Sequence, residues 1–247
     1  MNFFSLFKRK LIYKLRKKVP IDDFDDRGKS LDSLFHFYGS DKANIFKTRN
    51  DKGHGFTNFY LKHLKSFEGN NLNILEIGSY AGASAAAFVK YFDRTKVFCF
   101  DVNISNFKYK SENIQVFGLD IKNKQKVDKI IKEIFLKNNF ENFDIIIDDG
   151  SHKLSDILLS INNYFRYLKN NGLYIIEDFK HPNYYSYNRD IDHILIDKFL
   201  EKLKNKETFI SSILNEEDQK KLIYYIKKIY VYKGNLHDSD ICFIEKN

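Results

Sequence analysis

The stretch "LNILEIGSYAGAS", Leu72 to Ser84, joins a short apolar run to a glycine-containing turn. A run of this length bounded by a turn predicts a buried strand over "LNILEIG" (72–78), and the residues after the turn predict a helix over 83–92. Glycines at such a junction let the backbone bend sharply and approach a ligand closely. The stretch therefore predicts the first strand–turn–helix unit of an α/β sheet.

The same alternation continues along the chain. Strands are predicted at 96–102, 114–120, 143–149 and 172–178, and helices at 123–138, 154–169, around 190–204 and around 216–227. Two final β-runs, "KIYVYKGN" and "DSDICFIEK", are separated by a short polar turn and predict an antiparallel hairpin. Upstream, residues 31–67 look helical around a polar insert. The predicted fold class is α/β: a doubly wound, mostly parallel, Rossmann-like sheet of seven strands that ends in an antiparallel hairpin.

Length and composition suit one large α/β domain. The 247 residues are 43% hydrophobic and 30% charged, and no apolar run reaches the roughly 18 residues of a membrane span. Two lone cysteines, Cys99 and Cys242, favour a cytoplasmic protein without a disulfide framework. Of the net charge of +8, residues 1–20 contribute +7, which leaves about +1 for the rest. The body is therefore not a basic nucleic-acid-binding surface by charge alone.

The first 20 residues form a segment of their own. "FFSLFKRKLIYKLRKK" places Phe3, Phe7, Leu11 and Leu15 at helical spacing with cations between them, and it lacks the long apolar core and cleavage site of a signal peptide. Such a helix either lies on the inner face of an anionic membrane or packs on the body or on a second subunit. We predict three segments: the basic amphipathic helix (1–20), a helical or lid segment (21–71) and the main domain (72–247).

Residues that follow the first three strands predict a nucleoside pocket, because ligands of such sheets bind beyond the carboxyl ends of the strands. The turn alone could also be a dinucleotide site or only a tight turn, although Gly78-x-x-x-Gly82 departs from the G-x-G-x-x-G spacing of hydride-transfer enzymes. Asp101 ends the second strand and could accept hydrogen bonds from a ribose diol. Asp120 ends the third and could either recognise an adenine amino group or cap the next helix. The residues assigned to this pocket are Glu76, Gly78, Ser79, Gly82, Ser84, Asp101, Asp120 and Asp148.

A second site is predicted where two further strands end. Asp148 and Asp149 follow one strand with His152 close behind, and Glu177 and Asp178 follow the next. Several carboxylates close together repel one another unless they are protonated or hold a cation, and Mg²⁺ is a cation that prefers carboxylate oxygens. His152 could then take a proton from an acceptor hydroxyl. The alternative is that these acids cap helices or form surface ion pairs.

The glycine turn, the acids after the strands and the terminal hairpin resemble the class I S-adenosylmethionine-dependent methyltransferases over about residues 72–247. Within that class, "DDGSH" followed by "GLYIIEDF" looks like the metal-dependent sugar O-methyltransferases of the macrocin and mycinamicin type. That resemblance implies Asp149, Glu177 and Asp178 as ligands of Mg²⁺ or Mn²⁺ and His152, beside Asp149, as the catalytic base. The upstream "YGSDK…HGFTNFY" resembles the same family, which implies that Lys42, His54 and Tyr60 lie near the active site. Tyr184 and Tyr185 could stack on a substrate.

The resemblance leads us to expect an S-adenosylmethionine-dependent and metal-dependent O-methyltransferase. Its expected substrate is a sugar hydroxyl, with a nucleotide-linked hexose or heptose of capsule or lipopolysaccharide biosynthesis as the acceptor. A catechol-like acceptor is the alternative within enzymes, and a membrane-docked binding module without catalysis is the alternative outside them. Nucleic acid is not an expected partner, and a homo-oligomer stays open.

Overall fold

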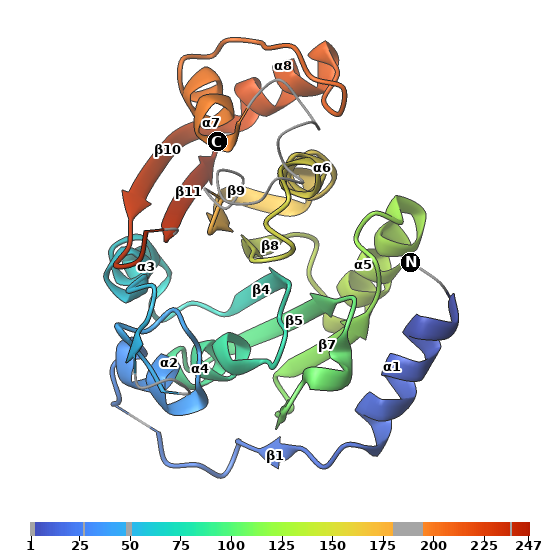
Figure 1. The fold of residues 1–247 in the computed structure, drawn as a ribbon, viewed down its shortest axis with the longest axis vertical. Coiled ribbons are helices and arrows are strands. Elements are labelled where there is room, and N and C mark those ends of the chain that lie inside the picture. The colour runs from blue at the N-terminus through green and yellow to red at the C-terminus, as the bar shows by residue number, and fades with distance from the viewer. Residues whose placement is uncertain (1–2, 27, 48–50, 180–194, 238) are drawn as a thin grey trace. The chain divides into compact units, whose positions relative to one another are not determined.

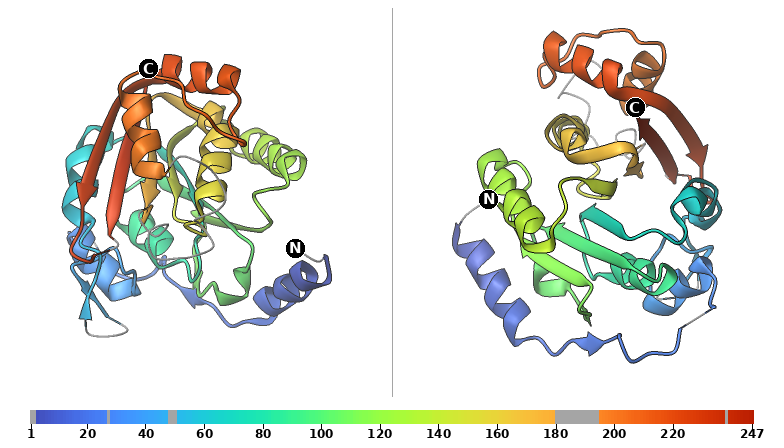
Figure 2. Two further views of the ribbon diagram at one scale, coloured as in Figure 1. Left: turned by 45° about the horizontal axis from the view of Figure 1, so that its top comes forward. Right: turned by 180° about the vertical axis from the view of Figure 1, so that it is seen from behind.

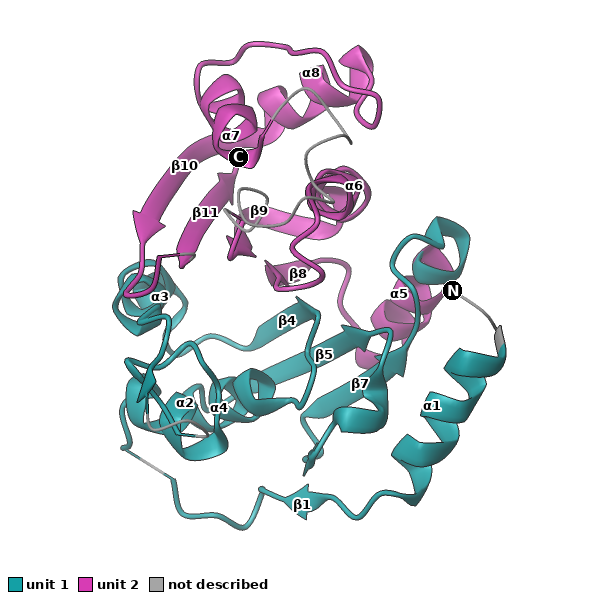
Figure 3. Cartoon of the chain, viewed as in Figure 1, with its two compact units in different colours: residues 1–127 teal, residues 128–247 magenta. Residues whose placement is uncertain are grey.

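A computed structural model describes residues 3–26, 28–47, 51–179, 195–237 and 239–247 of the chain (Figure 1). The chain divides into two compact units, residues 1–127 and 128–247 (Figure 3). The division falls within the helix α5 (Lys124–Asn138). No helix in the described part of the chain is long and apolar enough to cross a membrane.

Three parallel strands form the centre of the first unit: β4 (Leu72–Ile77), β5 (Thr95–Asp101) and β7 (Ile114–Gly118), in the order β4-β5-β7. Most residues of β4 and β5 are buried, because helices cover parallel strands and leave neither face to solvent. The register pairs Glu76 with Cys99 and Asp101 with Gly118. The strands consequently bring the segments that follow Ile77, Asp101 and Gly118 to one edge.

Helices α2 (Leu31–Tyr38), α3 (Thr57–Leu64) and α4 (Ala83–Tyr91) pack through aromatic side chains. The Phe35 and Phe88 rings meet edge to face with centroids 5.4 Å apart, and Tyr60 lies 5.4 Å from Phe88. Helix α2 begins at Ser30, whose hydroxyl accepts from the Ser33 N–H, and ends at Gly39 with a φ of 81°. A two-stranded ribbon, β2 (Ile45–Phe46) and β3 (Asp51–Lys52), lies between α2 and α3 in the chain, which confirms the predicted polar insert.

The basic segment forms the helix α1 (Phe3–Leu15), which packs against the 3₁₀ turn Ile104–Asn106 (Figures 1 and 2). After it, β1 (Val19–Pro20) pairs in parallel with β6 (Tyr109–Lys110). The helix expected from the sequence is confirmed over these bounds.

The second unit contains β8 (Phe143–Asp148), β9 (Leu168–Glu177), β10 (Ile226–Lys233) and β11 (Asp240–Lys246), in the order β10-β11-β9-β8. Strand β9 runs parallel to β8, and β11 runs antiparallel to both β9 and β10, as the hairpin in Figure 2 shows. All six residues of β8 are buried. The seven principal strands confirm the predicted class, a mostly parallel α/β sheet with an antiparallel hairpin at its end.

Helices of this unit are α6 (Leu154–Tyr164), α7 (Ile196–Lys204) and α8 (Glu216–Tyr225). The predicted extent of the first, 154–169, is wrong. The chain leaves α6 after Tyr164, makes a 3₁₀ turn over Phe165–Tyr167 and enters β9 at Leu168, four residues earlier than the predicted strand. Phe143 pairs with Leu168 and Ile145 with Leu173, so β9 bulges beside β8. Of the helix predicted around 190–204, residues 190–194 lie outside the described part of the chain.

Gly82 begins α4 with a φ of 77°, and a Cβ built on it would come within 2.3 Å of the Phe107 ring. We expect Gly82→Ala to lower the free energy of unfolding by about 2–4 kcal/mol, because the left-handed backbone strain adds to a clash with a buried ring. Urea unfolding followed by circular dichroism measures the change.

Gly69→Ala is the matched control. Gly69 has a φ of 79°, and a Cβ there would meet nothing within 4 Å, so only the strain of about 1 kcal/mol applies. Equal losses in the two variants would show that the Phe107 contact does not limit the turn.

Candidate functional site

The turn after β4 is shaped by two glycines with positive φ. Gly78, at 88°, donates its N–H to the Phe100 carbonyl at 2.8 Å, and Gly82 donates to the Ser79 carbonyl at 2.7 Å. The Ser79 hydroxyl donates to the Glu76 carbonyl at 3.2 Å. Three of the predicted pocket residues thus build one tight loop at the carboxyl end of β4.

Glu76 is completely buried and accepts a hydrogen bond from the Ser84 hydroxyl. The bond connects the end of β4 to the first turn of α4, and it offsets part of the cost of burying a carboxylate. In the structure, these two predicted pocket residues therefore contact each other inside the unit.

Asp101, the last residue of β5, organises the neighbouring loops. Its Oδ2 accepts from the Tyr80 N–H at 2.7 Å, and its Oδ1 accepts from the Asn103 N–H at 2.5 Å. A carboxylate has about four acceptor positions, so two main-chain donors leave capacity for a diol. The structure places Asp101 beside the glycine turn, as the sequence pattern requires.

Asp120 follows β7 and accepts from the Lys122 N–H at 3.1 Å. Helix α5 is capped by a different residue, Asn123, whose side-chain oxygen accepts from the Lys126 N–H at 3.1 Å. The helix-cap alternative for Asp120 is therefore wrong. The adenine contact stays a prediction.

Asp148 ends β8 in the second unit and is 4% exposed. Burial raises the pKa of this carboxyl to about 7; hydrogen bonds from Ser160 and the Gly150 N–H and the charge of His152 act in the opposite direction, and Asp149 adds to the rise. The Ser160 hydroxyl also pairs with the Tyr174 hydroxyl at 2.8 Å. A buried polar network therefore lies behind the end of β8.

Asp149, His152 and Asp178 form the cluster that defines the second site. Each offers one ligand atom, and these three atoms lie within 4.8 Å of one another. The His152 Nε2 is 3.9 Å from the Asp149 Oδ1. His152 and Asp178 both have left-handed backbones, with φ of 54° and 51°. These conformations are unusual for residues other than glycine, and here both turn side chains of separate loops toward one point.

Glu177, the third predicted ligand, does not belong to that cluster. It is the last residue of β9 and is 1% exposed. Asp178 comes directly after the strand, and its N–H donates to the Asp240 carbonyl at 2.8 Å. The structure thus brings together two of the three predicted ligands and adds the predicted base to them.

Sequence reasoning missed three residues that support this site: Ser160 and Tyr174 behind Asp148, and Asp240 beside Asp178. The serine had a signal, because it is a polar residue on the apolar face of α6. Asp240 had none, because its contribution is a main-chain oxygen.

The predicted substrate or lid residues lie in different surroundings. Lys42 is 1% exposed, and Tyr60 is completely buried between Phe35 and Phe88. His54 stacks on Phe56 with ring centroids 5.2 Å apart and lies 3.9 Å from an Asp41 oxygen. Tyr60 therefore contacts the core of its unit. Tyr184 and Tyr185 lie outside the described residues.

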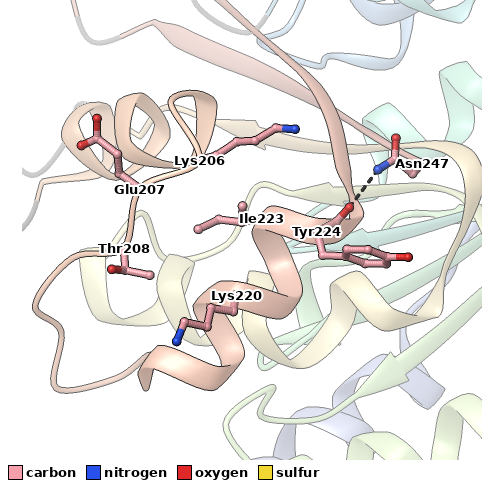
Figure 4. Close-up of a pocket in the computed structure, with 7 residues that line it drawn as sticks. All are labelled: Lys206, Glu207, Thr208, Lys220, Ile223, Tyr224 and Asn247. Atoms are coloured by element: carbon pink, nitrogen blue, oxygen red, sulfur yellow. Dashed lines mark hydrogen bonds between the residues drawn. The ribbon is translucent and has the colours of Figure 1, made fainter.

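A hollow of about 900 Å³ lies beside α8 in the second unit (Figure 4). Its lining includes Lys206, Lys220, Tyr224 and Asn247, and the Asn247 amide donates to the Tyr224 carbonyl at 2.8 Å. None of the predicted site residues that the structure describes lines it, so the volume of a hollow does not by itself locate the predicted site.

Comparisons with known proteins add to this geometry. Mycinamicin VI 2''-O-methyltransferase of Micromonospora griseorubida is 28% identical over an alignment of 144 residues, gaps included, and the match covers 51% of this chain and 31% of that protein. L-olivosyl-oleandolide 3-O-methyltransferase of Streptomyces antibioticus is 32% identical over an alignment of 135 residues, and the match covers 51% of this chain and 32% of that protein. The chain thus spans about a third of the length of these curated relatives.

Among solved structures, the MycE methyltransferase of the mycinamycin pathway, in complex with Mg, SAH and mycinamycin VI, shares the fold. The TM-score is 0.64 at 20% identity, over 89% of this chain and 55% of that one. The family model for FtsJ-like methyltransferases matches residues 59–246, which is well over half of the chain. The chain therefore belongs to the FtsJ-like methyltransferase family.

Proposed function

We propose that the protein is an S-adenosylmethionine-dependent and divalent-metal-dependent O-methyltransferase that acts on a sugar hydroxyl. The observation that carries the proposal is the convergence of Asp149, His152 and Asp178 within 4.8 Å. Family membership supports the methyl transfer. The relatives' names support an oxygen as the methyl acceptor, since both are O-methyltransferases, and the olivosyl group in one of the names supports a sugar.

The first unit fits the methyl donor. The tight turn at Gly78 and Gly82 allows close backbone approach, and the Asp101 carboxylate is held at its edge by two main-chain donors. When bound there, S-adenosylmethionine would supply an electrophilic methyl group with a good leaving group. Asp101 would bind its ribose hydroxyls, and Asp120 would accept from its adenine amino group.

The chemistry of the donor set fits a divalent cation. Asp149 and Asp178 provide carboxylate oxygens, which Mg²⁺ and Mn²⁺ both bind, and the imidazole of His152 would be left to take a proton. Glu177 stays a predicted ligand of Mg²⁺, although it lies outside the cluster of Asp149, His152 and Asp178. The metal would lower the pKa of an acceptor hydroxyl and fix its position.

His152 would accept the proton from the acceptor hydroxyl. Its Nε2 lies 3.9 Å from the Asp149 Oδ1. With the hydroxyl deprotonated, the remaining requirement is alignment of the oxygen with the methyl carbon. Under this proposal the first unit binds the donor and the second unit binds and deprotonates the acceptor.

The acceptor we propose is a nucleotide-linked hexose or heptose of capsule or lipopolysaccharide assembly. The match to the macrolide enzymes covers about a third of their length, so their large substrates are not carried over with it. We place the reaction in the cytoplasm. Cys99 and Cys242 are both free and buried, which is compatible with a reducing compartment.

The proposal is tested by incubating the full chain with S-adenosylmethionine and a panel of nucleotide-linked hexoses and heptoses, with Mg²⁺ or with EDTA. Mass spectrometry should detect a product heavier by one methyl group only in the metal-containing samples. A methylated product that forms equally with EDTA would remove the metal from the proposal. Failure of every sugar, with methylation of a catechol instead, would overturn the acceptor class.

His152→Gln keeps a polar side chain but removes the group that can take a proton. We expect turnover to fall about 10²- to 10⁴-fold, with binding of S-adenosylhomocysteine unchanged by calorimetry. His237→Gln, an exposed histidine of the same unit, is the control and should keep full turnover. Wild-type turnover in His152→Gln would exclude this residue as the base.

Asp149→Asn and Asp178→Asn each remove one charged ligand. We expect Mn²⁺ binding, followed by electron paramagnetic resonance of the free ion, to weaken at least about tenfold in each variant, because even indirect supports of metal ligands contribute this much. Glu133→Gln, on the exposed side of α5, is the control. Unchanged Mn²⁺ affinity in both Asp variants would mean that the cluster does not hold a cation.

A further inference from the structure

One face of helix α1 carries its contacts with the 102–107 segment. Arg9 donates to the Val102 carbonyl at 3.0 Å, and Arg16 donates to the Ser105 carbonyl at 2.7 Å. Between them, the Tyr13 ring meets the buried Phe107 edge to face at 6.4 Å. Residues 9, 13 and 16 lie on one side of a helix, so this side of α1 packs against the 102–107 segment.

The opposite face of α1 is apolar and exposed. Phe4, Phe7, Leu11 and Leu15 are 78%, 62%, 48% and 78% exposed, and their spacing places them on a single stripe. The contacts that hold α1 on the 102–107 segment come from the other face, so they do not account for Phe7, Leu11 and Leu15. A contiguous stripe of large apolar residues on a surface helix indicates an interaction site.

Cations border this stripe. Lys8 and Lys14 lie next to it on the helical wheel and are exposed, and residues 1–20 carry +7 with no acid. The outer face of α1 therefore combines exposed hydrocarbon with a high positive potential.

We propose that this face of α1 binds the surface of an anionic lipid bilayer, with the apolar stripe in the headgroup–acyl boundary and the lysines among lipid phosphates. Such a bilayer would bury the apolar stripe and attract the lysines through its negative charge. A nucleic acid would use the cations and leave the four apolar side chains in water. A second copy of the chain would bring another segment of +7 against the first.

The test is flotation of the full chain with vesicles of phosphatidylcholine alone or of equal parts phosphatidylcholine and phosphatidylglycerol. We expect flotation with the anionic vesicles only, and weaker flotation at high salt, where the charges are screened. Phe7→Ser/Leu11→Ser should lower the partition coefficient at least about tenfold, because two apolar side chains no longer leave water. Lys8→Glu/Lys14→Glu should lower it by more than about 25-fold, at roughly fivefold for each cation removed.

Matched controls change the same residue types away from α1. Leu136→Ser removes an apolar side chain that is 84% exposed, and Lys129→Glu/Lys132→Glu reverses two exposed charges on α5; both should float like the wild type. Equal flotation with neutral vesicles, or none with either kind, would overturn the proposal. So would binding to a single-stranded RNA homopolymer that Phe7→Ser/Leu11→Ser leaves intact, or a lipid-free dimer that the same variant dissociates in sedimentation. None of these measurements depends on methyl transfer.

Discussion

Repulsion between two carboxylates is the constraint on which the proposed chemistry depends. Asp149 and Asp178 lie with His152 in a cluster less than 4.8 Å across. Two like charges at that separation repel by at least about 3.5 kcal/mol at an effective dielectric constant of 20. The fold holds them there through a left-handed backbone at Asp178 and a hydrogen bond from its N–H to Asp240. A bound cation or a proton on His152 offsets this cost, and the proposed reaction uses both.

Much of the architecture was predictable from the sequence, because buried parallel strands consist of unbroken apolar runs. "LNILEIG" and "FDIIIDD" gave β4 and β8 to within a residue or two, and the terminal hairpin followed from two β-runs around a polar turn. The junction at 165–172 was not predictable. Its apolar residues continue the pattern of α6, while Asn171 adopts a φ of 58° and Gly172 passes close to the Asp144 carbonyl. Those features depend on the neighbouring strand.

Some features of the candidate site could likewise be predicted from the sequence, and others could not. Acids that follow neighbouring parallel strands share an edge by topology. Asp149 and Asp178 could therefore be placed together from the sequence within the second unit, and Asp101 beside the glycine turn within the first. Burial could not. Glu76 carries the pattern of a ligand-facing acid, yet its carboxylate lies inside the unit against Ser84. Tyr60 belongs to a motif that resembles an active-site segment, yet its ring packs between two phenylalanines. Both facts follow from three-dimensional packing, which a motif does not record.

Strand β11 has a consequence for the order in which the protein is made. Residues 240–246 are inserted between β9 and β10, and Asp240 bonds to Asp178 across 62 residues of sequence (178 to 240). When β8, α6 and β9 have left the ribosome, Asp149, His152 and Asp178 have all been released. Strand β11, whose Asp240 carbonyl holds the Asp178 N–H, has not. Domains fold as their chain emerges, and contacts of long sequence separation form late. We therefore expect the nascent chain to bring Asp149, His152 and Asp178 together only after nearly all of the second unit has been translated.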